Sequence, residues 1–374
     1  MSVSLAILTV IGAAVLAFGN GANDVSKGVA TLAGTGRTSY GQALAWGTLW
    51  TFGGGLASLV IAAGLVEAFT LAIVGPEVLA LSTFPLAVVA GAGSWVILAS
   101  VTGLPVSTTH ALTGSIVGVA LVAGGAGSVR WWIVLSAIAA PLALSPLLSA
   151  AIGYGMYAVA AAVSPACVCV RQDSFPGTVG ADGTLTGPLA TRLVVSTCTC
   201  AAGGQGLWSR GSGEGRRVMP AAVLHWGAAA ALSFARGVND NAKIAAIGAL
   251  GLATLNGSLW MAFVVAAVAM SVGSYTAGLR VTRTLGERVV HMGQDTGLAA
   301  SLGSAALVLA ASFYALPVST THVATGAIVG AGLRQDAAAV RWRRVGGLVG
   351  AWVVTLPIAA ALAALAMWAL GAGA

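Results

Sequence analysis

Two segments that carry an asparagine followed by an aspartate lie within long apolar stretches, one in each half of the chain. Residues 18–27 read FGNGANDVSK, and residues 234–243 read FARGVNDNAK. A charged group at the middle of a bilayer costs about 3 kcal/mol and usually faces a cavity or a pathway. The adjacent glycines weaken a helix, so we expect a break that exposes backbone carbonyls. Carbonyl, amide and carboxylate oxygens suit a small cation, although interhelical hydrogen bonds that only hold a bundle together are an alternative. The polar residues concerned are Asn23, Asp24, Asn239 and Asp240.

A lysine follows each aspartate by three residues, which puts both side chains on one face of a helix. The ammonium groups of Lys27 and Lys243 could neutralise Asp24 and Asp240 and replace a bound metal ion. They could also attract an anionic substrate or take part in proton movement. In the competing interpretation, each lysine extends along its helix towards the lipid headgroups.

A second motif, PVSTTH, occurs at residues 105–110 and again at residues 317–322. Proline fits the first turn of a helix, and the N–H groups of a helix start bind oxyanions together with hydroxyl groups. Two such starts facing each other could replace the water shell of a tetrahedral anion. The hydroxyls could instead bond to carbonyls of their own helix and shape a kink. His110 and His322 are either packing partners or titratable groups near the anion. The hydroxyl-bearing candidates are Ser107, Thr108, Thr109, Ser319, Thr320 and Thr321.

The composition indicates an integral membrane protein. Of the 374 residues, 58% are hydrophobic and 7% are charged, whereas soluble domains carry about 25% charged residues. The mean hydropathy of +0.94 agrees. The net charge of +7 is no sign of nucleic-acid binding, because the basic residues lie in short loops between apolar stretches. Since about 20 residues cross a bilayer, we expect ten spans in two groups of five. The spans are 3–33, 42–66, 84–103, 105–124, 131–160, 220–250, 257–279, 296–315, 317–333 and 345–370.

These spans predict an all-α membrane protein in three parts. Residues 1–163 form an N-terminal repeat, residues 164–219 a polar loop, and residues 220–374 a C-terminal repeat. Alternating the spans places most arginines on one side of the membrane and only Arg130 on the other. The positive-inside rule makes the arginine-rich side cytoplasmic. We therefore expect a multi-pass protein of the cell membrane with both termini outside and the polar loop in the cytoplasm.

The repeated motifs make the two halves an inverted-topology repeat. Five is an odd number of spans, so the second half enters the membrane from the opposite side. Many secondary transporters share this architecture and bind their substrate near the bilayer midplane, where the halves meet and one rocks against the other. A passive anion channel with the same hydroxyl sites is an alternative. A membrane enzyme is not expected, since no metalloprotease motif, Walker loop or Ser-His-Asp arrangement is visible in the spans.

At these residues the chain resembles the inorganic phosphate transporter (PiT) family. That family carries a Gly-Ala-Asn-Asp-type signature in each of two inverted halves, followed by a Pro-Val-Ser-x-Thr-His segment. The resemblance covers most of both halves and implies symport of inorganic phosphate, with no required cofactor apart from a coupling ion. It implies cation- and substrate-binding roles for the Asn-Asp residues at 23–24 and 239–240. It also implies phosphate-binding hydroxyls at residues 107–109 and 319–321.

The chain departs from the family pattern at one repeated position. Many members continue Asn-Asp-Val-Ala-Asn, with asparagine where this chain has Lys27 and Lys243. Two fixed positive charges beside the aspartates compete with sodium. We therefore favour proton coupling over sodium coupling, with the Lys–Asp pairs taking up and releasing the proton. A sulfate or other oxyanion permease is the alternative function.

The polar loop carries four cysteines in two pairs, which could bind zinc or an iron–sulfur cluster. One residue separates the members of each pair, whereas metal sites usually have two. Free or redox-active thiols and a disulfide are the alternatives. Beyond phosphate and the lipid bilayer, a homodimer is left open, and no nucleic acid is expected as a partner. The cysteines are Cys167, Cys169, Cys198 and Cys200.

Overall fold

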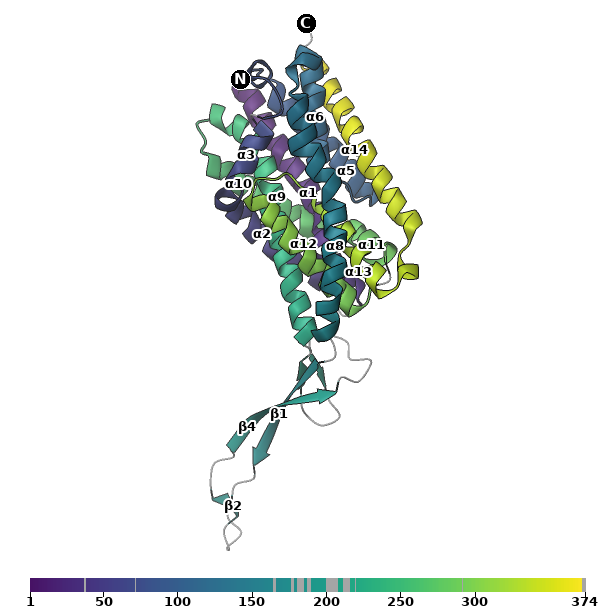
Figure 1. Cartoon of the computed structure of the whole chain (residues 1–374). Helices are drawn as coiled ribbons and strands as arrows, with labels where there is room; N and C mark the ends of the chain where they lie inside the picture. The colour runs from purple at the N-terminus through teal and green to yellow at the C-terminus, as the bar shows by residue number, and fades with distance from the viewer. Residues whose placement is uncertain are drawn as a thin grey trace.

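The structure is a computed structural model of the whole chain, drawn in Figure 1. It describes residues 1–36, 38–70, 72–163, 220–290 and 292–371, and between 164 and 219 only the backbone of six strands. Most of the described chain is helical, and the helices form one elongated bundle (Figure 1). Both ends of the chain lie at one end of this bundle, and the strands extend from the other.

The helices of the first half include several short or irregular connecting elements. They are α1 (Val3–Gly34), α2 (Tyr40–Ile61), α3 (Ala63–Thr70), α4 (Pro76–Leu79), α5 (Phe84–Thr102), α6 (Thr108–Gly124), the 3₁₀ turn η1 (Ala126–Ser128), α7 (Trp131–Ile133), the π-helix η2 (Val134–Ala139) and α8 (Ala140–Val163).

The second half repeats this order. Its elements are α9 (Pro220–Thr254), α10 (Leu259–Ala277), α11 (Leu279–Arg288), α12 (Gln294–Phe313), α13 (Thr320–Gln335), the 3₁₀ turn η3 (Ala337–Ala339) and α14 (Trp342–Ala369). A helix lies at every one of the ten predicted spans. By length and composition, seven helical segments of the described chain could cross a membrane, and the shorter α6 is also apolar. The helix α13 has only 16 residues, and α9 carries three charged residues at its centre. Ten crossings therefore remain a prediction.

Helices α1 and α9 run without interruption through the Asn-Asp motifs. The predicted helix break is therefore wrong. The glycines of the motifs serve close packing instead, because a Cβ atom on Gly21 would overlap the carbonyl oxygen of Met270 in α10. A Cβ atom on Gly237 would likewise overlap the carbonyl oxygen of Thr51 in α2. These glycines bring the backbones of helices from different halves into contact.

The PVSTTH motifs do begin helices, as predicted. Ser107 and Ser319 are the N-cap residues of α6 and α13, and their hydroxyls accept the backbone N–H of His110 and His322. The prolines lie before the cap rather than in the first turn. Each motif follows a turn with positive φ, at Gly103 in the first half and at Ala315 in the second.

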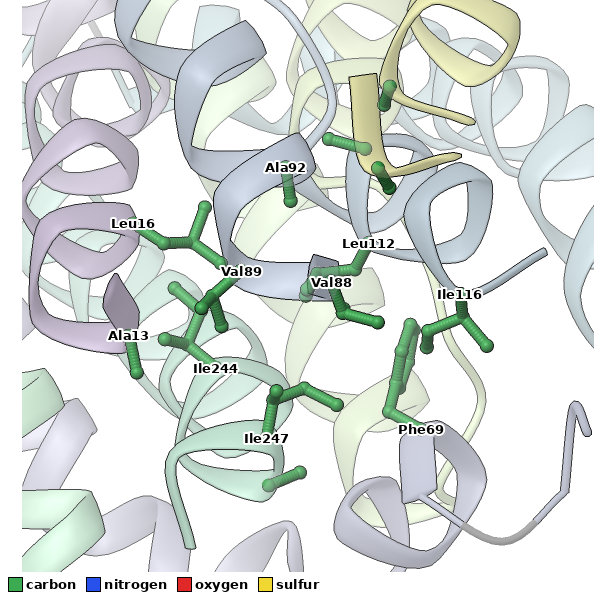
Figure 2. Close-up of a cluster of buried hydrophobic side chains, with 14 of the residues drawn as sticks. Ala13, Leu16, Phe69, Val88, Val89, Ala92, Leu112, Ile116, Ile244 and Ile247 are labelled. Carbon is green, nitrogen blue, oxygen red and sulfur yellow. The ribbon is translucent and has the colours of Figure 1, made fainter. Parts of the chain in front are cut away.

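Packing between the two halves is reciprocal. Helix α1 packs on α10 while α9 packs on α2, and α6 packs on α14 while α13 packs on α8. A two-fold relation between two copies of one unit generates pairs of this kind. Figure 2 shows an apolar cluster to which both halves contribute, where Leu16 of α1 and Leu112 of α6 lie near Ile244 and Ile247 of α9. The two halves therefore share one core.

The polar loop contains strands, which the sequence analysis did not predict. Strands β4 (Ala190–Thr199), β1 (Ala166–Phe175), β6 (Arg216–Val218) and β5 (Trp208–Arg210) form an antiparallel sheet in that order, and β2 (Thr178–Val179) pairs with β3 (Leu185–Thr186). Valine- and threonine-rich stretches favour strands over helix. The predicted metal or thiol site at Cys167, Cys169, Cys198 and Cys200 lies outside the side chains that the structure describes.

Candidate functional site

Each lysine of the repeated motif forms an ion pair with the aspartate three residues before it. Lys27 Nζ contacts Asp24 Oδ1, and Lys243 Nζ lies 3.5 Å from Asp240 Oδ1. At most 2% of any of these four side chains is exposed. The uninterrupted helices place both partners on one face, as the spacing predicts. The lysines therefore do not extend to the headgroups.

The two carboxylates lie on either side of one hydroxyl group. Thr320 Oγ1 of α13 is 3.3 Å from Asp24 Oδ2 of α1 and 3.5 Å from Asp240 Oδ2 of α9. In the first half, Asn20 Nδ2 donates to Thr108 Oγ1 at 2.7 Å and to Asp24 Oδ2 at 3.2 Å. These contacts join residues of both repeats into a single polar cluster, which we call the central cluster.

The asparagines of the motifs hold the chain that precedes the short helices. Asn23 donates to the carbonyl of Leu104 at 2.8 Å and accepts the N–H of Val106 at 3.0 Å. Asn239 lies 3.4 Å from the carbonyl of Val318. These amides position the starts of α6 and α13, which agrees with the structural alternative for Asn23 and Asn239. Unlike these amides, the carboxylates of the motifs lie in the central cluster.

The threonines of the two PVSTTH motifs do not bond to their own helix. Thr109 Oγ1 donates to the carbonyl of Val318 at 3.2 Å, and Thr321 Oγ1 donates to the carbonyl of Val106 at 2.7 Å. Each hydroxyl thus crosses to the other half of the protein. Lys243 Nζ also donates to Thr109 Oγ1 at 2.7 Å. The predicted hydroxyls at residues 108–109 and 320–321 therefore lie together, whereas those of residues 107 and 319 are used as helix caps.

Arg236, which lies one helical turn before Asp240 on α9, was not among the site residues expected from the sequence. Its side chain is 0% exposed, and it interacts electrostatically with Asp24 and Asp240. Its position in the second motif corresponds to Asn20 in the first. The signal that could have revealed it is this mismatch, because a charge replaces an amide within an otherwise matching pair of motifs.

The two motif histidines lie beside a separate cavity. The ring centroids of His110 and His322 are 4.9 Å apart, and His322 stacks at 4.0 Å on Trp352. The cavity of about 140 Å³ is also lined by Thr113 and by residues of η2. His322 Nδ1 contacts the carbonyl of Leu142 at 2.9 Å. The histidines therefore pack with each other at the ends of the two motifs, at the edge of the central cluster.

Two hollows rich in arginine adjoin the turn between α5 and α6. One, of about 1020 Å³, is lined by Thr102, Arg280 and Arg283, and the other, of about 400 Å³, by Pro105, Arg343 and Arg344, among others. Together we call them the basic vestibule. Arg280 reaches across it to the carbonyl of Val101 at the end of α5. The vestibule thus lies next to the segment that Asn23 holds.

The described residues contain no group of three or more His, Cys, Asp or Glu side chains that could bind a metal ion. The central cluster combines hydroxyl and carboxylate groups with the ammonium groups of Lys27 and Lys243, all shielded from solvent. Ammonium and hydroxyl donors suit an oxyanion, and burial strengthens each of these interactions. The fold and this cluster define a membrane transport protein with its polar site between two structural repeats.

The chain belongs to the phosphate transporter family, whose model matches residues 20–363. This confirms the resemblance seen in the sequence and the expectation of a transporter rather than an enzyme. The chain is 30% identical over 369 residues to a Mycobacterium bovis protein named probable low-affinity inorganic phosphate transporter, with 95% of this chain and 75% of that protein covered. A Rhizobium meliloti protein of the same name is 28% identical, with 94% and 92% covered.

A solved structure named the sodium-dependent phosphate transporter shares the fold. Its TM-score to this chain is 0.71 at 22% sequence identity, and the match covers 98% of this chain and 99% of the other. The similarity extends across both halves and therefore supports one fold for the whole chain.

Proposed function

We propose that the protein is a secondary transporter that takes up inorganic phosphate across the cell membrane. Family membership and the names of its relatives support phosphate as the substrate. The observation that carries the proposal is the hydroxyl of Thr320 lying between the carboxylates of Asp24 and Asp240. It joins one repeat to the other at a buried point, as a substrate site at a repeat interface requires.

The candidate phosphate ligands are the donors of the central cluster. Thr108, Thr109, Thr320 and Thr321 supply hydroxyls, and Lys27 and Lys243 supply ammonium groups. Asp24 and Asp240 accept hydrogen bonds from the protonated oxygens of phosphate. Asn23, Asn239, Ser107 and Ser319 act by holding the starts of the two short helices.

Proton coupling fits the ion pairs better than sodium coupling. The related solved structure is of a sodium-dependent transporter, but in this chain an ammonium group already contacts each carboxylate. A sodium ion at Asp24 would have to displace Lys27. We therefore assign the coupling role to the two Lys–Asp pairs: a proton taken up by an aspartate leaves the charge of its lysine unbalanced, and release of the proton restores the neutral pair.

Transport proceeds by alternating access between inverted repeats. The reciprocal packing of the halves supports an inverted repeat, and the burial of the central cluster supports a closed state in this structure. Under the positive-inside rule, the basic vestibule faces the cytoplasm. Phosphate released from the cluster would leave through it, attracted by its arginines.

Phosphate uptake by purified protein in liposomes tests this function. We expect labelled phosphate to accumulate above its external concentration under an imposed proton gradient, with or without sodium. A passive channel can only equilibrate phosphate. Failure to accumulate phosphate under either a proton or a sodium gradient would contradict the proposal. Equal competition by sulfate and phosphate would favour the alternative of a general oxyanion permease.

The aspartates provide the matched variants. Asp24→Asn and Asp240→Asn should each lower coupled uptake at least about tenfold, because each leaves a lysine unpaired in the cluster. Asp336→Asn is the control, since this exposed aspartate only caps η3. The amount of each variant in the membrane is measured in parallel. Wild-type uptake by both cluster variants would refute the role of the aspartates.

A further inference from the structure

Arg236 is a buried cation that the transport mechanism described above does not use. It lies on α9, where the repeat places Asn20 on α1. Its Nη2 atom donates to Thr51 Oγ1 of α2 at 2.6 Å and to Ser274 Oγ of α10 at 3.2 Å. These two hydroxyls fix the plane of the guanidinium group where helices of both halves meet.

The rest of the guanidinium group has no partner. Neither Nε nor Nη1 makes a hydrogen bond, although the side chain is completely buried. A guanidinium group has five N–H donors, and Nη2 carries only two of them. Leaving buried charged donors unpaired costs several kcal/mol. Asp24 and Asp240 stabilise the charge from a distance but accept none of these N–H groups. The arrangement therefore lacks an acceptor.

The buried charges of the described chain do not balance. Three are positive, on Lys27, Lys243 and Arg236, and two are negative, on Asp24 and Asp240. The remaining polar groups of the central cluster are neutral hydroxyls and amides, and the neighbouring histidines are counted as neutral. Since each lysine is paired with its aspartate, the excess positive charge belongs to Arg236. With both aspartates ionised, one bound monovalent anion would neutralise the site.

We infer that Arg236 is a ligand of the transported oxyanion and matches the site to an anion of single charge. The inference rests on the proposed function and specifies the ionic form of the substrate, dihydrogen phosphate. With both aspartates ionised, a dianion such as sulfate would leave the site with a net negative charge in a medium of low dielectric constant, which is unfavourable. The single arginine thus discriminates between two tetrahedral anions of similar size.

Uptake and binding by Arg236 variants test this inference. Arg236→Gln should raise the KM for phosphate at least about tenfold, the loss of one charge-assisted hydrogen bond. Arg236→Lys, which keeps the charge but not the geometry, should raise it less. In detergent, phosphate should raise the melting temperature of the wild type and not that of Arg236→Gln. Sulfate should compete with phosphate at least about tenfold more weakly in the wild type.

Thr51→Val is the matched control, because it removes a contact of Nη2 and leaves Nε and Nη1 unchanged. If Arg236 only braced α2 against α9, both variants would lower the melting temperature without changing KM. Wild-type KM in Arg236→Gln would overturn the inference. Sulfate competing as well as phosphate would overturn the charge matching. Either result leaves phosphate uptake by the wild type intact, whereas no uptake by the wild type contradicts the proposed function itself.

Discussion

Lys27 and Lys243 decide how the carboxylates of this chain are neutralised. Each ammonium group contacts its aspartate and also donates to a backbone carbonyl. Lys27 Nζ lies 3.4 Å from the carbonyl oxygen of Val106, and Lys243 Nζ lies 3.1 Å from that of Val318. A sodium ion bound by carboxylate and carbonyl oxygens would make the same contacts. At the residue scale, we therefore propose that the lysines take the place of a bound cation.

Replacing a motif lysine by a neutral residue should make phosphate uptake depend on a bound cation. In Lys27→Asn the buried Asp24 loses its ion-pair partner, so we expect phosphate uptake at constant pH to become dependent on sodium, with a stimulation of about tenfold or more. Lys27→Arg keeps the positive charge and should stay independent of sodium. If Lys27→Asn takes up phosphate at the wild-type rate whether or not sodium is present, the lysine does not take the place of a cation.

At the scale of helices, the sequence predicted where the helices lie along the chain better than it predicted which helices pack together. The apolar stretches located helical segments at all ten expected spans to within a few residues, because length and hydropathy are local properties. The PVSTTH motifs likewise marked the starts of α6 and α13, although the serines cap these helices and the prolines lie before them. The continuity of α1 and α9 was missed, since the packing of Gly21 and Gly237 depends on which helix lies opposite. The exchange of helix partners between halves and the role of Arg236 depend on tertiary contacts in the same way.

Glycine substitutions test the close contacts of these helices. Gly21→Ala and Gly237→Ala put a methyl group against a backbone carbonyl, and we expect each to destabilise the protein by about 1–3 kcal/mol, the typical cost of overpacking. Gly350→Ala in α14 has no heavy atom within 4 Å of the added carbon and should leave stability unchanged or slightly raised. Thermal unfolding in detergent gives the comparison, and equal melting temperatures for all three variants would refute the packing role.

At the scale of the whole molecule, the basic vestibule makes the two faces of the protein different. The turn between α5 and α6 borders the vestibule. The equivalent turn between α12 and α13 presents exposed aromatic side chains, Phe313 and Tyr314, each 71% exposed. In Figure 1, α11 of the vestibule lies in the half of the bundle nearer the strands. Finding the side of the membrane that the vestibule faces would therefore give the orientation of the chain.

Thiol labelling can locate this face. With the four natural cysteines replaced by serine, Thr102→Cys in the vestibule should react with a membrane-impermeant reagent only in inside-out vesicles. Tyr314→Cys, at the equivalent turn of the other repeat, should react only in right-side-out vesicles. Labelling of both from one side would exclude an inverted arrangement of the repeats.

The mismatch between Asn20 and Arg236 has an energetic consequence for the transport cycle. If the two repeats were identical, the inward- and outward-open conformations would be related by the two-fold axis and would have equal free energies. A guanidinium group in only one repeat removes that degeneracy. Its partners Thr51 and Ser274 are not duplicated either, because the reciprocal contacts of Gly237 and Gly21 match them to Met270 and Gly55. The unloaded carrier should therefore rest mostly on one side of the membrane, and arrival of the anion should rebalance the two populations.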